Sequence, residues 1–411
     1  MTQLKSEIMK NTILIALAIF CFSCKNDKNQ EQKSISNANQ EVLKSIDKEL
    51  DSLYNLAIFN GFTATIVDST GIVYNKGFGY ADVTAKKAYT DKTIINIASV
   101  SKLFIGVGLL KAQEMNLLDL DDSINNYLPF EVVHPKYPDE IITIRQLATH
   151  TSALVDTELY LETAYATIDN ITIAENLKRY TTYYQNSPSH WMPLAEYMAK
   201  LLNQEGEYYT PKVYANRKPG ASFEYSNIGA ALCGLVIENA TKQSFNEFTK
   251  EQIFEPLAMS STGWFFEEVA MTNYSKLYYD ELELPYYKIL SYPDGGLITS
   301  STDMGKFLAD LIKGYSGNGK ILSALGYEEL FKSQLDESAF EKKKNYNVGL
   351  FTEKELAYDV IGHTGGDPGT NTMLFFNTQT KKGRIFIANT DSKKENSNSV
   401  MWGIWDAIGK Y

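Results

Sequence analysis

Ser99 and Lys102 lie three positions apart in the tetrad Ser99-Val100-Ser101-Lys102, which interrupts a long apolar run. At the start of a helix this spacing places both side chains on one face, and apolar surroundings would depress the pKa of the lysine by desolvation. Such a lysine can activate a serine hydroxyl without histidine, so the tetrad predicts covalent catalysis at Ser99. The structural alternative is a helix cap at Ser99 with Lys102 extending to water.

Spacing alone does not identify the nucleophile, because Ser45-Ile46-Asp47-Lys48 has the same pattern. That tetrad lies on an amphipathic helix predicted over Glu41 to Asn60, among Lys44, Glu49 and Asp51, where a solvated polar face explains it fully. The apolar surroundings of Lys102 are what distinguish the second tetrad.

Two further motifs follow along the chain. Tyr225-Ser226-Asn227 precedes a helix predicted to open at Asn227 or Ile228, and His363-Thr364-Gly365-Gly366 follows a strand-like segment. Glycines there would let backbone N–H groups approach a substrate closely. Taken singly, each motif has a structural explanation, namely a core tyrosine beside a capping Asn and a histidine satisfied at a strand end.

The elements that must position these motifs come from both ends of the chain. Alternating apolar residues and turn residues predict these strands: Phe62 to Val67, Ile72 to Tyr80, Tyr346 to Phe351, Tyr358 to Gly362, Thr370 to Asn377 and Gly383 to Asn389. A last helix is predicted over Val400 to Ile408. We therefore expect an α/β lobe made of about 41–101 and 288–411, with a helical lobe of about 102–287 inserted and a cleft between the lobes. A Tyr-rich stretch, 157–214, has no clear period.

The order of the three motifs resembles the serine penicillin-recognising family, in particular its class C β-lactamase and D-Ala-D-Ala carboxypeptidase branch. The resemblance extends from about residue 41 to the C-terminus, which is then one catalytic domain, 41–411. Supporting stretches are Thr143-Ile144-Arg145-Gln146-Leu147-Ala148-Thr149-His150-Thr151-Ser152, Pro219-Gly220, and Pro293 to Asp303. It implies a β-lactamase/transpeptidase-like fold, with an antiparallel sheet flanked by N- and C-terminal helices.

Carried over residue by residue, the resemblance makes Ser99 the acylated nucleophile and Lys102 with Tyr225 the proton-transfer pair, without deciding which of the two is the base. The backbone N–H groups of Ser99 and Gly366 would form the oxyanion hole. Asn227 would contact Lys102 or the substrate amide. The other substrate-binding residues implied are His363, Thr364 and Gly365. His150 is placed in a structural segment near the cleft, outside the catalytic set.

Two departures from the family pattern bear on the substrate. The β-lactamases of this branch usually carry Lys where this chain has His363, and a mostly neutral imidazole binds a carboxylate less strongly than an ammonium group does. The 126-position gap between Ser99 and Tyr225 contains the Tyr-rich stretch 157–214. That insertion either influences substrate choice or packs as extra surface.

The N-terminus predicts export. Lys10 precedes an apolar run, and Ser23-Cys24 resembles a lipoprotein cleavage site, so we expect a signal peptide over 1–23 and a lipidated Cys24 followed by a polar tether, 24–40. An ordinary signal peptide or a retained anchor are the alternatives. A bacterial cell-envelope location, lipid-anchored to a membrane, follows. Cys233, in an apolar stretch, is predicted to be a buried small hydrophobe.

These features favour a metal-free serine hydrolase of an amide or ester, with no cofactor. A D-amino-acid peptide or peptidoglycan fragment, in carboxypeptidase-like fashion, is the favoured substrate, ahead of a β-lactam and then a small ester. The net charge of −11 disfavours a nucleic-acid partner. A catalytically silent envelope-binding protein is the competing class, although it would have no chemical need for a buried lysine. The oligomeric state is not indicated.

Overall fold

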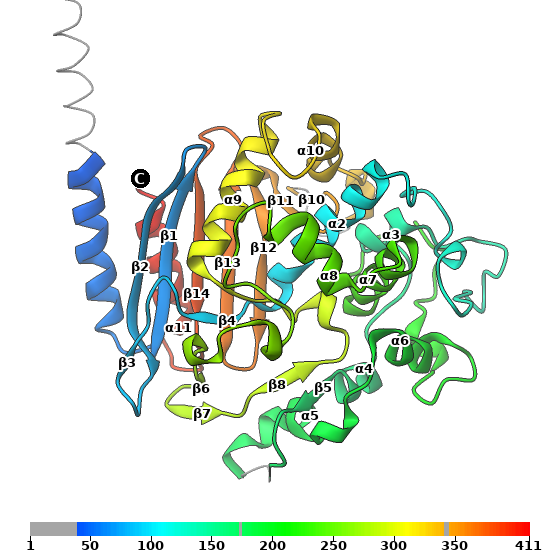
Figure 1. Cartoon of the computed structure of the whole chain (residues 1–411), viewed down its shortest axis with the longest axis horizontal. Helices are drawn as coiled ribbons and strands as arrows, with labels where there is room; N and C mark the ends of the chain where they lie inside the picture. The colour runs from blue at the N-terminus through cyan, green and yellow to red at the C-terminus, as the bar shows by residue number, and fades with distance from the viewer. Residues whose placement is uncertain (1–38, 172–174, 341–344) are drawn as a thin grey trace, which may run out of the picture.

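An eight-stranded antiparallel sheet is the centre of the fold, in the order β10-β11-β12-β13-β14-β1-β2-β3 (Figure 1). The computed structural model describes residues 39–171, 175–340 and 345–411. The sheet strands are β1 Gly61–Asp68, β2 Gly71–Asp82, β3 Lys87–Ala88, β10 Tyr346–Val348, β11 Glu353–Glu355, β12 Val360–Asp367, β13 Thr370–Asn377 and β14 Gly383–Ala388. Strands from the two ends of the chain thus meet where β14 pairs with β1.

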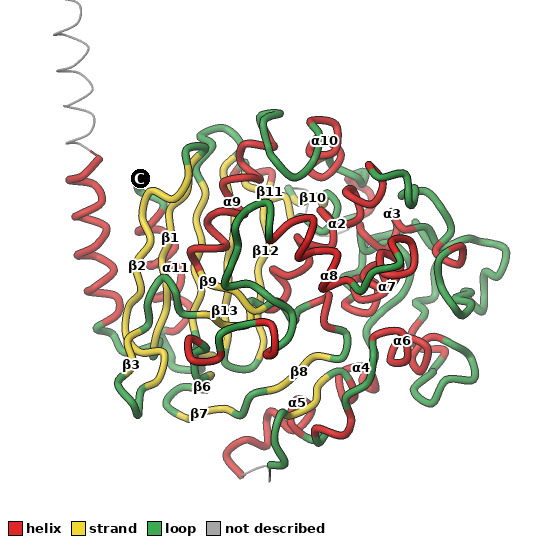
Figure 2. The backbone as a smooth tube through the Cα atoms, in the orientation of Figure 1, coloured by secondary structure: helices red, strands yellow, loops and turns green. Residues whose placement is uncertain are grey.

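Shorter strands and the helices surround this sheet (Figure 2). The short strands are β4 Ile94–Asn96 paired with β9 Ile298–Ser300, β5 Tyr165–Thr167 paired with β8 Tyr287–Ile289, and the group β6 Leu277–Tyr279, β7 Leu282–Leu284 and β15 Thr390–Asp391. The helices are an opening helix at 39–54, α2 Lys102–Glu114, α3 Ile144–Ala148, α4 Glu158–Thr163, α5 Thr181–Tyr184, α6 Leu194–Leu202, α7 Asn227–Thr241, α8 Phe245–Thr249, α9 Ser301–Tyr315, α10 Ala324–Phe331 and α11 Ser397–Ile408.

Alternation along β13 builds a core on each face of the sheet. Leu374 and Phe376 join the large core that continues under α9 and into the helical side. Met373 and Phe375 face the other way and join a second core, which the opening helix and α11 cover. Successive side chains of a strand point to opposite faces, so one strand contributes to both cores.

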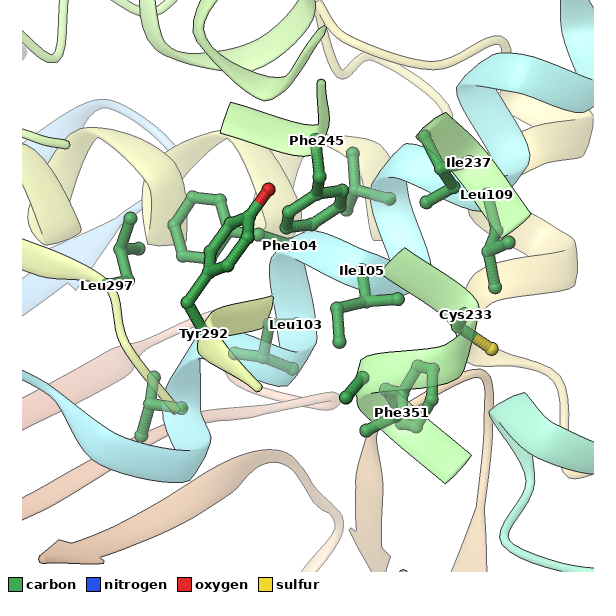
Figure 3. Close-up of a cluster of buried hydrophobic side chains, with 14 of the residues drawn as sticks. Leu103, Phe104, Ile105, Leu109, Cys233, Ile237, Phe245, Tyr292, Leu297 and Phe351 are labelled. Carbon is green, nitrogen blue, oxygen red and sulfur yellow. The ribbon is translucent and has the colours of Figure 1, made fainter. Parts of the chain in front are cut away.

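The helical side is built on α2 and α7, which are apolar on almost every face. Every residue of α2 from Lys102 to Leu110 is buried, which is the pattern of a helix enclosed by protein. Figure 3 shows α2 side chains packed near Phe245 and Tyr292, with Cys233 of α7 nearby. Cys233 is fully buried, as predicted, and burial raises the pKa of its thiol.

The Tyr-rich insertion forms short elements, in keeping with its lack of period. Within 157–214 the longest described helix is α6, of nine residues. β5 is attached to the rest of the molecule through its antiparallel pairing with β8 (Figure 1). The insertion therefore reaches the sheet side of the molecule as well as the helical side.

Several predicted boundaries differ from the structure. The strand predicted over Tyr346 to Phe351 ends at Val348, and Phe351 has a left-handed φ of +51°. The opening helix ends at residue 54 rather than near Asn60, and Ala57 just beyond it has a left-handed φ of +54°. β12 continues through His363 to Asp367 instead of ending at Gly362, because β13 pairs with it as far as Thr370. The chemistry-bearing glycines therefore lie in a strand.

The N-terminal predictions fall largely outside the described residues. These are the signal peptide 1–23, the lipidated Cys24 and all but the last two residues of the tether 24–40. Across the part of the chain that is described, we find no helix with the length and apolar character needed to cross a membrane.

Candidate active site

Ser99 lies in a 3₁₀ turn, Ala98–Ser101, immediately before α2. Within the stretch 93–110, Ser99 is the single residue that is partly exposed, while every other residue is buried. Ala98 has a left-handed φ of +49°, and its N–H donates to Asn96 Oδ1 at 2.6 Å. A non-glycine residue in this conformation costs of order 1 kcal/mol and must be held by its surroundings. The strained turn presents Ser99 to solvent from an otherwise closed core.

Lys102 is fully buried and directs its ammonium group back to that turn. Lys102 Nζ donates to Ser99 Oγ at 3.0 Å, to Asn227 Oδ1 at 2.7 Å and to the Asp294 backbone oxygen at 2.5 Å. Side chains three residues apart eclipse each other in 3₁₀ geometry, which brings Ser99 and Lys102 into contact. All three hydrogen atoms of the ammonium group have acceptors.

The predicted depression of the Lys102 pKa is wrong in sign. Desolvation is the largest single effect and lowers the pKa, but the interactions with the Tyr225 hydroxyl and with the Asp294 and Asp156 carboxylates together outweigh it and raise the pKa above its usual range. The sequence revealed the apolar neighbours and not the carboxylates. Lys102 therefore rests as an ammonium ion at neutral pH.

Tyr225 completes a three-way contact with Ser99 and Lys102. Its hydroxyl interacts with both side chains, each of which lowers its pKa, and Lys102 Nζ lies 5.1 Å from the centre of its ring. Burial raises the pKa of Tyr225, while the ammonium group of Lys102 opposes that rise. The resting pair is an ammonium ion beside a neutral phenol, so it must lose one proton before it can accept the proton of Ser99.

Asn227 is oriented by a carboxylate that sequence reasoning missed. Asp156 accepts hydrogen bonds from the Asn227 side-chain amide at 2.8 Å and from the backbone N–H groups of Asn227 at 3.1 Å and Ile228 at 3.0 Å. An ionised carboxylate only accepts, so the NH₂ group of Asn227 must face Asp156 and its oxygen must face Lys102. Asp156 also lies at the N-terminus of α7, where the helix dipole favours a negative charge.

Two histidines lie against Tyr225. The His150 ring stacks on the Tyr225 ring, with centres 4.5 Å apart, and its Nδ1 accepts from the Ser226 backbone N–H at 3.1 Å. The His363 ring centre lies 6.2 Å from that of Tyr225. Burial, reinforced by the charge of Lys102, lowers the pKa of His363 to about 3, so the imidazole is neutral. His150 thus positions Tyr225, although sequence analysis placed it outside the catalytic set.

The β12 backbone lies directly against the Ser99 turn. A Cβ added to Gly365 would stand 2.5 Å from the Ile97 oxygen and 3.1 Å from the Ser99 nitrogen, whereas one on Gly366 would meet nothing. Glycine is needed at 365 for this approach. The oxyanion hole assigned to the N–H groups of Ser99 and Gly366 stays a prediction, and both residues lie at this junction.

Thr364 and His363 do not face the same way, although sequence analysis expected both to line one cleft. Thr364 pairs with Met373, whose side chain belongs to the core under α11, and it lines a groove there with Phe375 and Trp405. His363 lies on the opposite face, beside Tyr225. Strand alternation separates adjacent side chains in this way.

Two further carboxyl groups come close to the site, the buried Asp294 and the half-buried Asp367, and each is contacted by a tyrosine of the insertion. Tyr160 donates to Asp294 Oδ2 at 2.7 Å, and Tyr165 donates to Asp367 Oδ1 at 2.8 Å. Desolvation raises the pKa of Asp294 to about 6 and that of Asp367 to about 7. Neither was singled out from the sequence, although Asp367 directly follows the motif that starts at His363.

The described residues contain no group of three or more His, Cys, Asp or Glu side chains that could hold a metal ion. The sequence predicts neither a metal nor a cofactor. The contact of Ser99 with Lys102 and Tyr225 is suited to proton transfer from the serine, which covalent catalysis at that residue requires.

Comparison with known proteins identifies relatives over most of the chain. A family model described as Beta-lactamase matches residues 56–404. Penicillin-binding protein 4* of Bacillus subtilis (strain 168) is 24% identical over 384 residues, covering 88% of this chain and 75% of that protein. Protein flp of Staphylococcus aureus (strain NCTC 8325 / PS 47) is 25% identical over 344 residues, covering 81% of this chain and 60% of that protein.

Solved structures show the same fold. The octameric penicillin-binding protein homologue from Pyrococcus abyssi superposes with a TM-score of 0.67 at 23% identity, over 90% of this chain and 77% of that one. D-amino acid amidase from Ochrobactrum anthropi SV3, complexed with L-phenylalanine, gives a TM-score of 0.66 at 20% identity, over 90% and 98% of the two chains. These likenesses confirm the predicted β-lactamase/transpeptidase-like fold.

Proposed function

Because the chain belongs to the β-lactamase family, we propose that it is a serine hydrolase that cleaves an amide or ester through an acyl-enzyme on Ser99. The observation that carries this proposal is the mutual contact of Ser99, Lys102 and Tyr225, in which a buried ammonium group touches the one exposed hydroxyl of its turn. A silent binding protein would have no chemical use for that contact.

In the proposed first step, the Lys102–Tyr225 pair has already lost one proton to solvent. Ser99 Oγ attacks the scissile carbonyl carbon while the Ser99 proton enters the pair, which leaves Tyr225 as a neutral phenol. The developing oxyanion is stabilised by the backbone N–H groups of Ser99 and Gly366, an interaction worth several kcal/mol in such sites. Collapse breaks the bond to the leaving group, which takes a proton from Tyr225. Water then attacks the acyl-enzyme in the reverse sense and frees Ser99.

The favoured substrate class is a D-amino-acid peptide or peptidoglycan fragment, ahead of a β-lactam or a small ester. A neutral His363, where family β-lactamases usually carry Lys, offers no positive charge for a substrate carboxylate. Lys102 is charged, but its three hydrogen atoms already have acceptors, so none is free to donate to a substrate carboxylate. These charges argue against the carboxylate-recognising, carboxypeptidase-like form of the proposal.

A turnover panel tests the proposal. p-Nitrophenyl acetate, a chromogenic cephalosporin, D-amino-acid p-nitroanilides and a D-Ala-D-Ala peptide are incubated with wild type, Ser99→Ala, Tyr225→Phe and the control Ser45→Ala. We expect Ser99→Ala and Tyr225→Phe to lose turnover of whichever substrates wild type cleaves, and Ser45→Ala to retain it. Turnover that survives Ser99→Ala contradicts the mechanism. No turnover by wild type, together with measurable binding of a wall fragment, favours the silent binding protein.

We also propose export to the bacterial cell envelope and lipid anchoring through Cys24, on the N-terminal sequence alone. Metabolic labelling with palmitate checks this in the full chain. Incorporation that disappears in Cys24→Ser supports the anchor, and equal incorporation in both proteins, or none in wild type, contradicts it.

A further inference from the structure

Asp367 lies on the face of β12 that carries the active-site contacts. His363, Gly365 and Asp367 alternate along this strand, so their side-chain positions share one face. Gly365, in the middle, touches the Ser99 turn. His363 and Asp367 therefore lie on opposite sides of the reacting serine, with about 13 Å of strand between them.

One oxygen of the Asp367 carboxylate is anchored and the other has no partner. Oδ1 accepts the Tyr165 hydroxyl at 2.8 Å, and Oδ2 receives no hydrogen bond from the described residues. A Cβ on Gly295 would stand 3.6 Å from Asp367 Oδ2 and 3.8 Å from the carbonyl carbon of Ala98, which is bonded to the Ser99 nitrogen. Asp367 Oδ2 and the nucleophile turn therefore lie on either side of the same glycine, Gly295, at most about 7.4 Å apart.

Tyrosine rings surround the anchored side of this carboxylate. The Tyr165 ring meets the Tyr183 ring edge-on at 4.6 Å and the Tyr287 ring at 5.5 Å. Burial first, and then the charge of Asp367, raises the pKa of all three hydroxyls. A carboxylate among aromatic rings is a suitable environment for an organic cation.

The position of Tyr225 indicates which part of the substrate, the leaving group or the acyl part, would lie near Asp367. In the proposed mechanism Tyr225 protonates the leaving group, and its ring lies near His363. The leaving group therefore lies at the His363 end of the β12 face. The acyl part of the substrate then extends toward Asp367.

We propose that Asp367, held by Tyr165 of the insertion, is a specificity-determining residue that binds an ammonium group carried by the acyl part of the substrate. The inference rests on the proposed function and narrows its substrate class to aminoacyl amides, esters or peptides with a free amino group. The Asp367 carboxyl is half-buried, and desolvation makes it costly to ionise without a cation; the ligand's ammonium group would offset that cost. The Tyr-rich insertion then contributes to substrate choice through Tyr165.

Paired substrates test this inference. D-alanine p-nitroanilide, N-acetyl-D-alanine p-nitroanilide and the neutral ester p-nitrophenyl acetate are compared in wild type, Asp367→Asn, Tyr165→Phe and the exposed-site control Asp139→Asn. We expect wild type to prefer the free amine. Asp367→Asn should lower kcat/KM for the free-amine substrate by about 10- to 100-fold, which corresponds to the loss of a hydrogen bond to a charged group. It should lower kcat/KM for the N-acetyl substrate and the ester by less than about threefold. Tyr165→Phe should act in the same direction, with a smaller effect.

An equal loss on all three substrates in Asp367→Asn would mean a structural role and overturn the inference. So would a wild type that cleaves the ester but not the free-amine anilide, or that prefers the N-acetyl substrate. If Asp367→Asn does not fold, Tyr165→Phe serves as the test. A loss of kcat/KM in Tyr165→Phe that is equal for the free-amine and N-acetyl substrates contradicts the proposal. Failure of the proposed function has a different signature. If Ser99→Ala still cleaves the ester, Ser99 is not the nucleophile, and this outcome does not depend on Asp367.

Discussion

Removing the ionisable group of Asp367 should stabilise the protein at high pH and leave it unchanged at low pH. Burial raises the pKa of Asp367 from 3.8 to about 7, against the opposing effects of Tyr165 and Lys102. Between these values the unfolded chain has lost the proton that the folded chain still holds, so wild-type stability falls as the pH rises through this window. Asn carries no such proton, and its oxygen can still accept from Tyr165.

The size of the effect follows from the shift. At 1.36 kcal/mol per pKa unit, the ionised Asp367 carboxylate lowers the free energy of unfolding by about 4 kcal/mol above pH 7. A chain of this length unfolds with an entropy of about 0.8 kcal/mol/K, so the difference corresponds to roughly 5 °C in Tm. Because the other groups titrate in both proteins, comparing variant with wild type largely cancels their contributions.

The assay is thermal unfolding of wild type, Asp367→Asn and the control Asp139→Asn at pH 4.5 and pH 8. We expect the Tm of Asp367→Asn to exceed that of wild type by only about 1 °C at pH 4.5, where the loss has just begun, and by several degrees at pH 8, while the control shows no such change with pH. A difference that is the same at both pH values, or a variant less stable at pH 8, would refute the reasoning. It would mean that the folded protein stabilises the charge without a ligand.

Three other substitutions test the geometry of the site. Gly365→Ala places a methyl group against the Ser99 turn and should lower the free energy of unfolding by about 1–3 kcal/mol and abolish most of the turnover. In Gly366→Ala the methyl group meets nothing, so thermal unfolding should show wild-type stability. In Asp156→Asn the new side chain can donate a hydrogen bond where Asp156 only accepts, so the Asn227 amide is free to flip its NH₂ group toward Lys102. We expect kcat to fall about tenfold or more while substrate binding changes little. An unchanged kcat would contradict this positioning role.

Sequence patterns were sufficient for the elements that depend on local periodicity. β13 spans Thr370–Asn377 as predicted, because its side chains alternate between two cores. The extension of β12 through the glycines was missed, since its cause is the pairing with β13 and not its own composition. The opening helix was predicted too long because apolar spacing continues past the point where the backbone turns.

The chemistry was predictable where the residues lie close in sequence. Ser99 and Lys102 are three positions apart, and the structure brings them together with Tyr225. The direction of the Lys102 pKa shift was not predictable. Tyr225 is the largest of the causes that raise this pKa and was identified from the sequence, but the two carboxylates that add to it, Asp294 and Asp156, come from distant segments. No local pattern marks a carboxylate that becomes an orienting partner only through the tertiary fold.

Covalent labelling tests the central claim, acylation of Ser99, most directly. A fluorophosphonate is incubated with the wild-type protein, Ser99→Ala and Ser45→Ala, and adducts are counted by intact mass and located by peptide mapping. The mechanism predicts one adduct per chain on Ser99 in wild type and in Ser45→Ala, and none in Ser99→Ala. An adduct that persists in Ser99→Ala, or one that maps to another residue in wild type, would contradict it.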